Sequence, residues 1–205
     1  MPDHQNHLKQ TYLLDTQEKT DAFYADWAAT YDAEVIENGY ATPARLSAAL
    51  KGFVPPTAKI LDIGCGTGYS GFHLHQAGFR NITGTDPVVE MLEIALKRAV
   101  YTNIWQTDLT DPYPFDPGVY DVITAIGVIT TGAAPATLLP QTIDQLAKGG
   151  LIAFSYNDKA LEDPTYTQMR DKVLTSGTVR ELYRNYGPHL TGKKINSDIY
   201  IFERL

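Results

Sequence analysis

The chain has 205 residues, of which 43% are hydrophobic and 20% are charged, and its formal net charge is −7. This length exceeds the roughly 150 residues of a typical domain but falls short of two, which predicts one domain with an added cap. The acidic balance disfavours a nucleic-acid partner, because phosphate contacts require clustered Lys and Arg. The single cysteine, Cys65, excludes an intramolecular disulfide and a zinc site built from several cysteines.

Targeting signals are absent from the sequence pattern. No apolar run approaches the roughly 20 residues that a transmembrane helix needs. The opening residues, MPDHQNHLKQ, lack the basic region and the apolar stretch of a secretory signal. We therefore expect a cytoplasmic protein that binds a small molecule and has no membrane partner, no nucleic-acid partner and no metal.

Residues 1–55 are predicted to form an N-terminal helical lid. Residues 1–10 are polar, and we expect them to be frayed. Aromatic and apolar residues recur every fourth position between Thr16 and Glu37, which predicts a helix. These residues are Phe23, Trp27, Tyr31 and Val35. A second helix is expected to start at Pro43, since proline suits the first helical position, and to end at Lys51 before Pro55–Pro56.

Residues 56–205 alternate between strand and helix patterns, which predicts a parallel sheet covered on both faces. The expected strands are Lys59–Ile63, Asn81–Thr85, Asn103–Thr107, Tyr120–Ile126, Leu151–Tyr156, Val179–Tyr186 and Asp198–Glu203. The expected helices are Tyr69–Ala77, Val88–Ala99, Ala136–Ala147 and Thr165–Thr175. Only roughly ten residues separate the last two strands, too few for a crossover helix, so we expect them to pair antiparallel.

The stretch KILDIGCGTGYSG is the most informative part of the chain. A strand ends at Asp62-Ile63, and Gly64, Gly66 and Gly68 occupy the turn before a helix. Glycines suit such a turn because it demands positive φ and because a ligand must approach the bare backbone. Open α/β sheets bind their ligands beyond the carboxyl ends of the strands. This loop is therefore the predicted binding site.

Two ligand classes compete for the loop. Residues 66–71 also fit the G-x-G-x-x-G dinucleotide pattern, with Asp86 the expected ~20 residues later. S-adenosylmethionine is favoured over NAD because Asp62 would suit the ammonium of a methionine moiety and repel a pyrophosphate. Asp108, in NIWQTDL, is placed to accept a hydrogen bond from an adenine amino group. Too few residues also remain for the separate substrate domain that most dehydrogenases need.

Asp86 closes the expected second strand in ITGTDP. An ionised carboxylate there can accept hydrogen bonds from both ribose hydroxyls. The alternative reading is a helix N-cap before Pro87, and one residue can serve both purposes. Met91, in the helix that follows, is a candidate for packing on adenine, with ordinary core filling as the alternative.

Four motifs together resemble the successive motifs of class I S-adenosylmethionine-dependent methyltransferases. They are ILDIGCGTG, TGTD, QTDL and YDVITAIGVI, and they span residues 57–156. The N-terminal FYADWAATYDAEV also resembles the opening of the Williams–Beuren-region methyltransferase-like proteins. The resemblance implies an enzyme with S-adenosylmethionine as cofactor. Its fold would be α/β, a doubly wound, seven-stranded, mostly parallel sheet with an antiparallel last strand, which is the methyltransferase variant of the Rossmann fold.

The resemblance also implies roles for particular residues. Those implied to hold the cofactor are Tyr31, Asp62, Gly64, Cys65, Gly66, Gly68, Asp86, Pro87, Met91, Asp108, Leu109, Ile126 and Gly127. Asp62 and the loop backbone would hold the methionine end, Asp108 and Leu109 the adenine, and Ile126 and Gly127 the sulfonium. Methylators of base and glutamine amino groups carry Asn/Asp-Pro-Pro-aromatic where this chain has residues 125–128, Ala-Ile-Gly-Val. That reaction is accordingly disfavoured.

The acceptor side is predicted from strand ends and from the lid. The candidates are Tyr31, Tyr156, Asn157 and His189. Tyr156 and Asn157 end the expected fifth strand, and His189 falls in the expected turn between the last two strands, where a solvated loop histidine is the alternative. We predict a methyltransferase acting on a small molecule; the alternatives are a NAD-binding oxidoreductase and a non-catalytic S-adenosylmethionine-binding module. The acceptor, its accepting atom and the need for a general base stay open.

Overall fold

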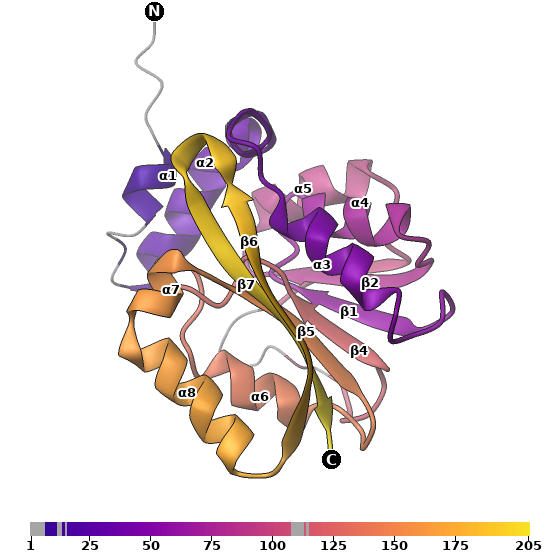
Figure 1. Ribbon diagram of the computed structural model, residues 1–205. Helices are drawn as coiled ribbons and strands as arrows, with labels where there is room; N and C mark the ends of the chain where they lie inside the picture. Colours follow the sequence, from indigo (N-terminus) through magenta and orange to yellow (C-terminus); the bar gives the residue numbers. More distant parts are fainter. Residues whose placement is uncertain (1–6, 12–13, 15, 108–112, 114) are drawn as a thin grey trace, which may run out of the picture.

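The computed structural model describes residues 7–11, 14, 16–107, 113 and 115–205. Within them, seven strands form one sheet in the order β3-β2-β1-β4-β5-β7-β6 (Figure 1). The strands are β1 (Lys59–Ile63), β2 (Asn81–Asp86), β3 (Asn103–Gln106), β4 (Val122–Ala125), β5 (Leu151–Asn157), β6 (Val179–Leu190) and β7 (Ile195–Arg204). The order reverses between β1 and β4, so a crevice opens beyond their carboxyl ends.

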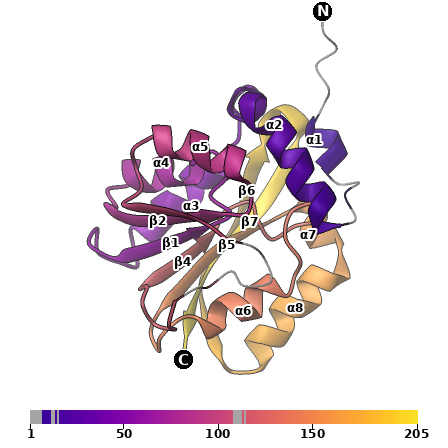
Figure 2. The same cartoon turned by 180° about the vertical axis from the view of Figure 1, so that it is seen from behind.

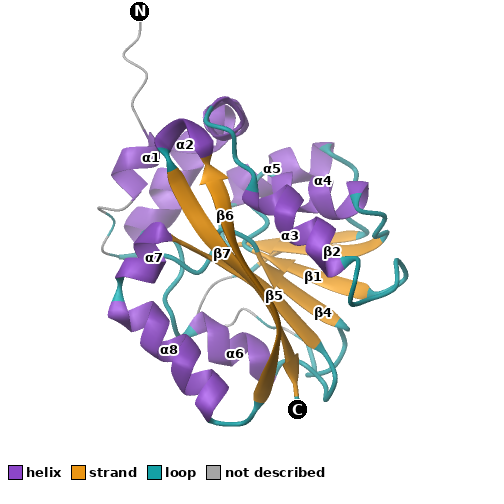
Figure 3. Cartoon of the chain, viewed as in Figure 1, coloured by secondary structure: helices purple, strands orange, loops and turns teal. Residues whose placement is uncertain are grey.

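Strands β1 to β5 pair parallel, and β7 runs antiparallel between β5 and β6. The expected doubly wound sheet with its antiparallel last strand is confirmed. The central strands read as continuous apolar runs because helices cover both of their faces, and the residues of β4 and β5 are all buried. Figure 3 shows how the loops at one end of these strands gather beneath the N-terminal helices.

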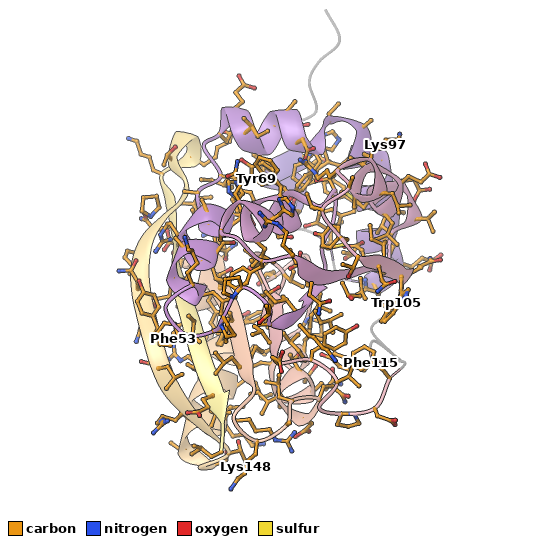
Figure 4. The ribbon with its side chains drawn as sticks, turned by 90° about the vertical axis from the view of Figure 1, so that its right-hand side faces the viewer. Phe53, Tyr69, Lys97, Trp105, Phe115 and Lys148 are labelled. Carbon is orange, nitrogen blue, oxygen red and sulfur yellow. The ribbon has the colours of Figure 1, made fainter. Side chains whose placement is uncertain are left out.

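Helices cover both faces of the sheet (Figures 1 and 2). Those of the described residues are α1 (His7–Gln10), α2 (Gln17–Glu37), α3 (Thr42–Leu50), α4 (Tyr69–Gln76), α5 (Val89–Lys97), α6 (Leu138–Asp144), α7 (Asp158–Glu162) and α8 (Pro164–Thr175). Helices α3 and α4 bury leucines against one face of the sheet, and α6, α7 and α8 pack in a separate apolar cluster on the other. Figure 4 shows the β3 edge, where the rings of Trp105 and Phe115 lie 6.2 Å apart.

Helix α2 forms the lid. It begins after Thr16, whose hydroxyl accepts a hydrogen bond from the Lys19 N–H, and it packs on α5. Ala28 of α2 is buried with Val88 and Met91 in a small apolar cluster. In Figure 2 the helix lies across the end of the sheet from which the loops emerge. The lid thus covers the crevice that the strand order creates.

Three elements differ from the sequence expectation. The short helices α1 and α7 were not predicted; Asn157 starts α7 by accepting a hydrogen bond from the Ala160 N–H. Strand β6 runs on to Leu190, because an edge strand with a bulge accepts Pro188 where a central strand would not. Consequently His189 lies on a strand and is buried, not in a solvated turn.

No helix of the described residues combines the length and the apolarity that crossing a membrane would take.

Candidate active site

The glycine loop between β1 and α4 presents bare backbone to the crevice. Gly64 has φ +61°, and a Cβ there would come within 2.6 Å of Val128 Cγ2, so no side chain fits. Gly66 has φ +53°, but a Cβ on it would meet nothing within 4 Å. A side chain at residue 66 would therefore project into open space, which is the shape expected where a ligand lies against the backbone.

Asp86, at the end of β2, fastens this loop and faces the same space. Its two oxygens accept hydrogen bonds from the Gly66 N–H at 2.8 Å and the Val88 N–H at 2.9 Å. Burial, which deprives the carboxylate of hydration, and the nearby charge of Asp21 together raise its pKa to about 6. Each oxygen keeps a second lone pair for a ligand hydroxyl. The N-cap of α5 is Val88 and not Asp86, which accepts a hydrogen bond in the turn before that helix. This bond leaves Asp86 able to bind a ligand.

Asp62 lies beneath the loop and does not reach the crevice. It is fully buried, and its carboxylate accepts hydrogen bonds from Ser70 Oγ at 2.5 Å, Thr124 Oγ1 at 2.7 Å and Tyr101 Oη at 2.9 Å. Desolvation raises its pKa despite these bonds. Three hydroxyl groups surround this carboxylate, and its predicted contact with a methionine ammonium stays a prediction. Asp62 ties β1, β4 and α4 together under the glycine turn.

A cavity, here named the loop cavity, lies between the glycine loop and the lid. Its walls include Gly64, Gly66, Asp86, Pro87, Met91, Ile126 and Gly127 of the predicted cofactor residues. The lid contributes the candidates Tyr31 and Tyr24, and also Gln17, Thr20 and Asp21, which the sequence reasoning missed. Residues 17, 21, 24, 28 and 31 share one face of a helix, so extending the aromatic stripe toward the N-terminus would have found them. Asp108 and Leu109, predicted for adenine, lie outside the described residues.

The lid is fastened to the glycine loop by one ionic cluster. Asp32 of α2 accepts a hydrogen bond from Thr67 Oγ1 at 2.6 Å and pairs with Arg98. The Arg98 Nε–H also donates to the Thr67 carbonyl at 2.7 Å. Because Thr67 lies between two of the loop glycines, the position of the lid and the conformation of the loop are linked.

A second cavity, here named the hairpin cavity, adjoins the loop cavity under the lid. It is lined by Leu8, Thr11, Tyr24, Trp27, Tyr31, Val35, Tyr40, Gly127, Thr130, Asn157, His189 and Leu190. Three of its residues, Tyr24, Tyr31 and Gly127, also line the loop cavity. Gly127 has φ +76°, and a Cβ there would overlap Tyr40 Oη, so this junction requires glycine.

Polar groups of the hairpin cavity are held by defined hydrogen bonds. Asn157 Oδ1 accepts from Thr130 Oγ1 at 2.9 Å and from the Ala160 N–H at 3.0 Å. His189 Nδ1 lies 2.8 Å from Thr42 Oγ1. The structure thus brings together three of the four acceptor-side candidates, Tyr31, Asn157 and His189, from segments far apart in the sequence.

The comparisons with known proteins agree with this arrangement. Residues 60–150 match a family model described as a methyltransferase domain. The chain is 32% identical to human methyltransferase-like protein 27 over 138 residues, 65% of this chain and 56% of the relative. It is 34% identical to trans-aconitate 2-methyltransferase of Agrobacterium fabrum over 120 residues, 57% of this chain and 46% of the relative. The chain therefore spans about half the length of these curated relatives.

Solved structures share the fold. A TehB-like S-adenosylmethionine-dependent methyltransferase of Corynebacterium glutamicum superimposes with a TM-score of 0.60 at 18% identity, covering 93% of this chain and all of the other. The strand order and the glycine loop are those of the class I methyltransferase fold, and residues 60–150 are similar to a methyltransferase domain. The solved structure is named for S-adenosylmethionine as its cosubstrate.

The residues of the loop cavity fit S-adenosylmethionine. The open space above Gly66 leaves room for a ligand against the backbone, and Asp86 offers carboxylate lone pairs at the edge of the same cavity. A dinucleotide pyrophosphate would meet two carboxylates here, Asp86 and Asp21, without a basic residue among the described lining residues. Coulomb repulsion makes that pairing unfavourable.

Four of the predicted residues line neither the loop cavity nor the hairpin cavity. Tyr156 is fully buried in the apolar cluster beneath β5, with its ring 5.9 Å from that of Tyr166, and it lines neither cavity. Cys65 is buried, and desolvation holds the pKa of its thiol well above the ordinary value. Gly68, with φ +82°, precedes α4 and packs beside Tyr101. Asp62 is the fourth, as described above.

Proposed function

We propose that this chain transfers the methyl group of S-adenosylmethionine to a small molecule bound in the hairpin cavity. The observation that carries the proposal is the junction: the loop cavity and the hairpin cavity share Tyr24, Tyr31 and Gly127. Methyl transfer is an in-line displacement that needs donor and acceptor roughly 3 Å apart, aligned and shielded from water. Two adjoining cavities under one lid meet this requirement.

The lining of the hairpin cavity supports a small, mostly apolar acceptor. Its walls are largely aromatic and aliphatic, with a few polar groups, which is the usual composition of a small-molecule site. No Asp, Glu, Lys or Arg is among its described lining residues. A nucleic-acid acceptor would need basic residues near the site, and the net charge of −7 also opposes it. The Agrobacterium relative is likewise named for a small molecule, trans-aconitate.

We also propose that the chain belongs with the Williams–Beuren-region subgroup. Its motif FYADWAATYDAEV forms the middle of α2, and this segment does two jobs in the site. Tyr24, Trp27 and Tyr31 line the cavities, while Asp32 bonds to the glycine loop. The human relative at 32% identity supports the same placement.

When bound, S-adenosylmethionine supplies a methyl group on a positively charged sulfur, already activated for displacement. The residues of this chain bind and orient: Asp86 accepts hydrogen bonds from hydroxyl groups, and the Gly66 backbone lies against the ligand. Asp62 keeps the loop in place from below. Tyr31 and Gly127 form the passage between the two cavities, and the lid excludes water from it.

The test combines binding with turnover. Calorimetric titration should show binding of S-adenosylhomocysteine and no binding of NAD. Incubation with methyl-labelled S-adenosylmethionine and a small-molecule cell extract should transfer label to a low-mass product, with one S-adenosylhomocysteine released per methyl group. Tight NAD binding would support the oxidoreductase alternative. Binding of S-adenosylhomocysteine without transfer to any extract fraction would support the non-catalytic binding module, and label in RNA would reject the small-molecule acceptor.

A further inference from the structure

We propose that His189 recognises the methyl acceptor as a neutral hydrogen-bond donor, with its proton on Nε2. The residues Arg45, Ser197 and Thr42 would select this tautomer. The inference rests on the proposed function of the hairpin cavity as the acceptor site. It assigns the acceptor a chemical property: a lone pair, on a carbonyl, hydroxyl, ether or ring nitrogen, that faces His189.

A continuous chain of hydrogen bonds leads from Arg45 to the His189 ring. An Nη1–H of Arg45 donates to Ser197 Oγ at 3.1 Å. Ser197 Oγ lies 2.9 Å from Thr42 Oγ1, which lies 2.8 Å from His189 Nδ1. Thr42 and Ser197 are fully buried, so water does not complete their hydrogen bonds.

The Arg45 guanidinium determines which group donates and which accepts in each of these hydrogen bonds. A guanidinium can only donate, so Ser197 Oγ accepts from Arg45. The proton of the Ser197 hydroxyl then has one acceptor among the described residues, Thr42 Oγ1. The Thr42 hydroxyl, having accepted, gives its own proton to His189 Nδ1. The opposite direction would leave a buried Ser197 proton without a partner, which costs more than a normal hydrogen bond contributes.

An imidazole that accepts at Nδ1 carries its proton on Nε2 when it is neutral. Desolvation, assisted by the positive charge of Arg45, lowers the pKa of His189 to about 4. The ring lines the hairpin cavity while Nδ1 is occupied by Thr42, so Nε2–H is the polar group left to meet an acceptor. Tyr40 packs edge-on against the ring, with centroids 5.1 Å apart, and holds its plane.

The neighbouring carboxylate does not make His189 a base. Asp158 raises the pKa of His189 through its charge. However, its oxygens accept hydrogen bonds from Tyr186 Oη and the Asn196 N–H, each at 2.8 Å, so they are committed to β6 and β7. A group with a pKa of about 4 takes a proton poorly at neutral pH. We therefore propose that His189 donates a hydrogen bond and does not act as a base.

A second buried donor belongs to the same wall. Trp27 lines the hairpin cavity, and its Nε1 has no hydrogen-bond partner among the described residues. An indole N–H can only donate. Both groups therefore favour an acceptor that presents lone pairs and carries no donor of its own at these points.

The tautomer can be tested without an acceptor. In nitrogen-15 NMR spectra of the full chain, with His189 assigned by its loss in His189→Gln, we expect a neutral ring with its proton on Nε2 from neutral pH down to about pH 5. Thr42→Val removes the donor to Nδ1 and should give a mixture of both tautomers, as should Ser197→Ala to a smaller extent. The titratable groups around the ring are Asp158, Arg45 and Tyr40, and their charges would influence the pKa of His189. A proton on Nδ1, or a charged ring at neutral pH, overturns the proposal.

Turnover separates a donor from a base. In His189→Gln the side-chain amide keeps an N–H near the position of Nε2 but cannot act as a base. With labelled S-adenosylmethionine and the small-molecule extract, this variant should keep activity within roughly tenfold, whereas His189→Leu should lose roughly a hundredfold. Both should bind S-adenosylhomocysteine like the wild type. Equal loss in both variants, or full activity of His189→Leu, rejects the donor role. If the wild type transfers no label, the proposed function fails instead, and the NMR result still decides the tautomer.

Discussion

The two cavities under the lid are built in different ways. The loop cavity takes its key features from two short segments, residues 64–66 and 86–91: the bare backbone at Gly66 and, beside it, the carboxylate of Asp86. The hairpin cavity is assembled from the lid, the segment after β4, the end of β5 and the end of β6. It uses side chains. Recognition of a constant cosubstrate can rest on backbone geometry, whereas recognition of a variable acceptor needs exchangeable side chains.

The largest effect should come from filling the space above Gly66. Gly66→Leu places a side chain where a Cβ meets nothing within 4 Å, and we expect binding of S-adenosylhomocysteine to be lost. Gly177→Leu is the matched control, because Gly177 has φ +74° and open space around it but lies outside the cavities. Each variant should lose about 1–2 kcal/mol of stability from the left-handed backbone. Calorimetry measures the S-adenosylhomocysteine affinity and thermal unfolding measures the stability. Equal affinity in the two variants would contradict a ligand site above Gly66.

Removing the carboxylate at the end of β2 should have the next largest effect. Asp86→Ala should weaken S-adenosylhomocysteine binding by roughly 1.5–3 kcal/mol, since charge-assisted hydrogen bonds to hydroxyl groups are lost. Asp121→Ala is the control: Asp121 also accepts a backbone hydrogen bond, from the Lys59 N–H at 2.8 Å, but lines neither cavity. Unchanged affinity in Asp86→Ala would remove Asp86 from the ligand site.

The pH dependence of binding should follow the same residue. With a pKa of about 6, the Asp86 carboxylate is ionised at neutral pH and protonates as the pH falls through that value. Its bonds to ligand hydroxyls weaken accordingly, and the loss of S-adenosylhomocysteine affinity should approach tenfold per pH unit below the pKa. Asp86→Asn cannot titrate and should bind weakly but evenly over the same range. A flat wild-type profile from about pH 7 to about pH 5 would rule out ionised Asp86 as the binding form.

At the junction of the cavities, turnover and binding should separate. Tyr31→Phe removes one hydroxyl and should lower methyl transfer roughly fivefold, a loss of about 1 kcal/mol, with S-adenosylhomocysteine affinity changed only slightly. Tyr183 lies outside both cavities, so Tyr183→Phe should leave both methyl transfer and S-adenosylhomocysteine affinity unchanged. Asn157→Ala should resemble Tyr31→Phe but also loosen the start of α7. Full activity in both cavity variants would place the acceptor elsewhere.

The smallest effect is expected where Asp32 of the lid bonds to the glycine loop. Asp32→Asn weakens the contact with Arg98 and Thr67, a partly exposed pair that contributes about 1 kcal/mol or less. Hydrogen exchange in α2 should become faster, and S-adenosylhomocysteine affinity should fall a few-fold. Glu37→Gln removes a charge from the exposed end of the same helix and should change neither. Unaltered exchange in Asp32→Asn would show that apolar packing alone holds the lid.

The sequence by itself determined the sheet and the glycine loop, because both depend on local rules. Alternating apolar runs and helical periods specify strands covered on both faces, and a turn with positive φ requires glycine. The lid helix followed from its four-residue aromatic spacing, although its ligand-facing side was only partly anticipated. Asp86 was found because it ends a strand, and strand ends meet at one edge of the sheet.

Tertiary structure decided which polar groups face a ligand. Asp62 precedes the glycines as a ligand-binding carboxylate would, yet three hydroxyl groups from other segments surround it. Side chains of a strand alternate between its two faces, so Tyr156 packs in the apolar core, whereas the next residue, Asn157, lines the hairpin cavity. For His189 the decisive partner, Thr42, lies 147 residues away, so no local pattern could reveal it. Burial and long-range hydrogen bonds set these outcomes, because they depend on which segments pack together.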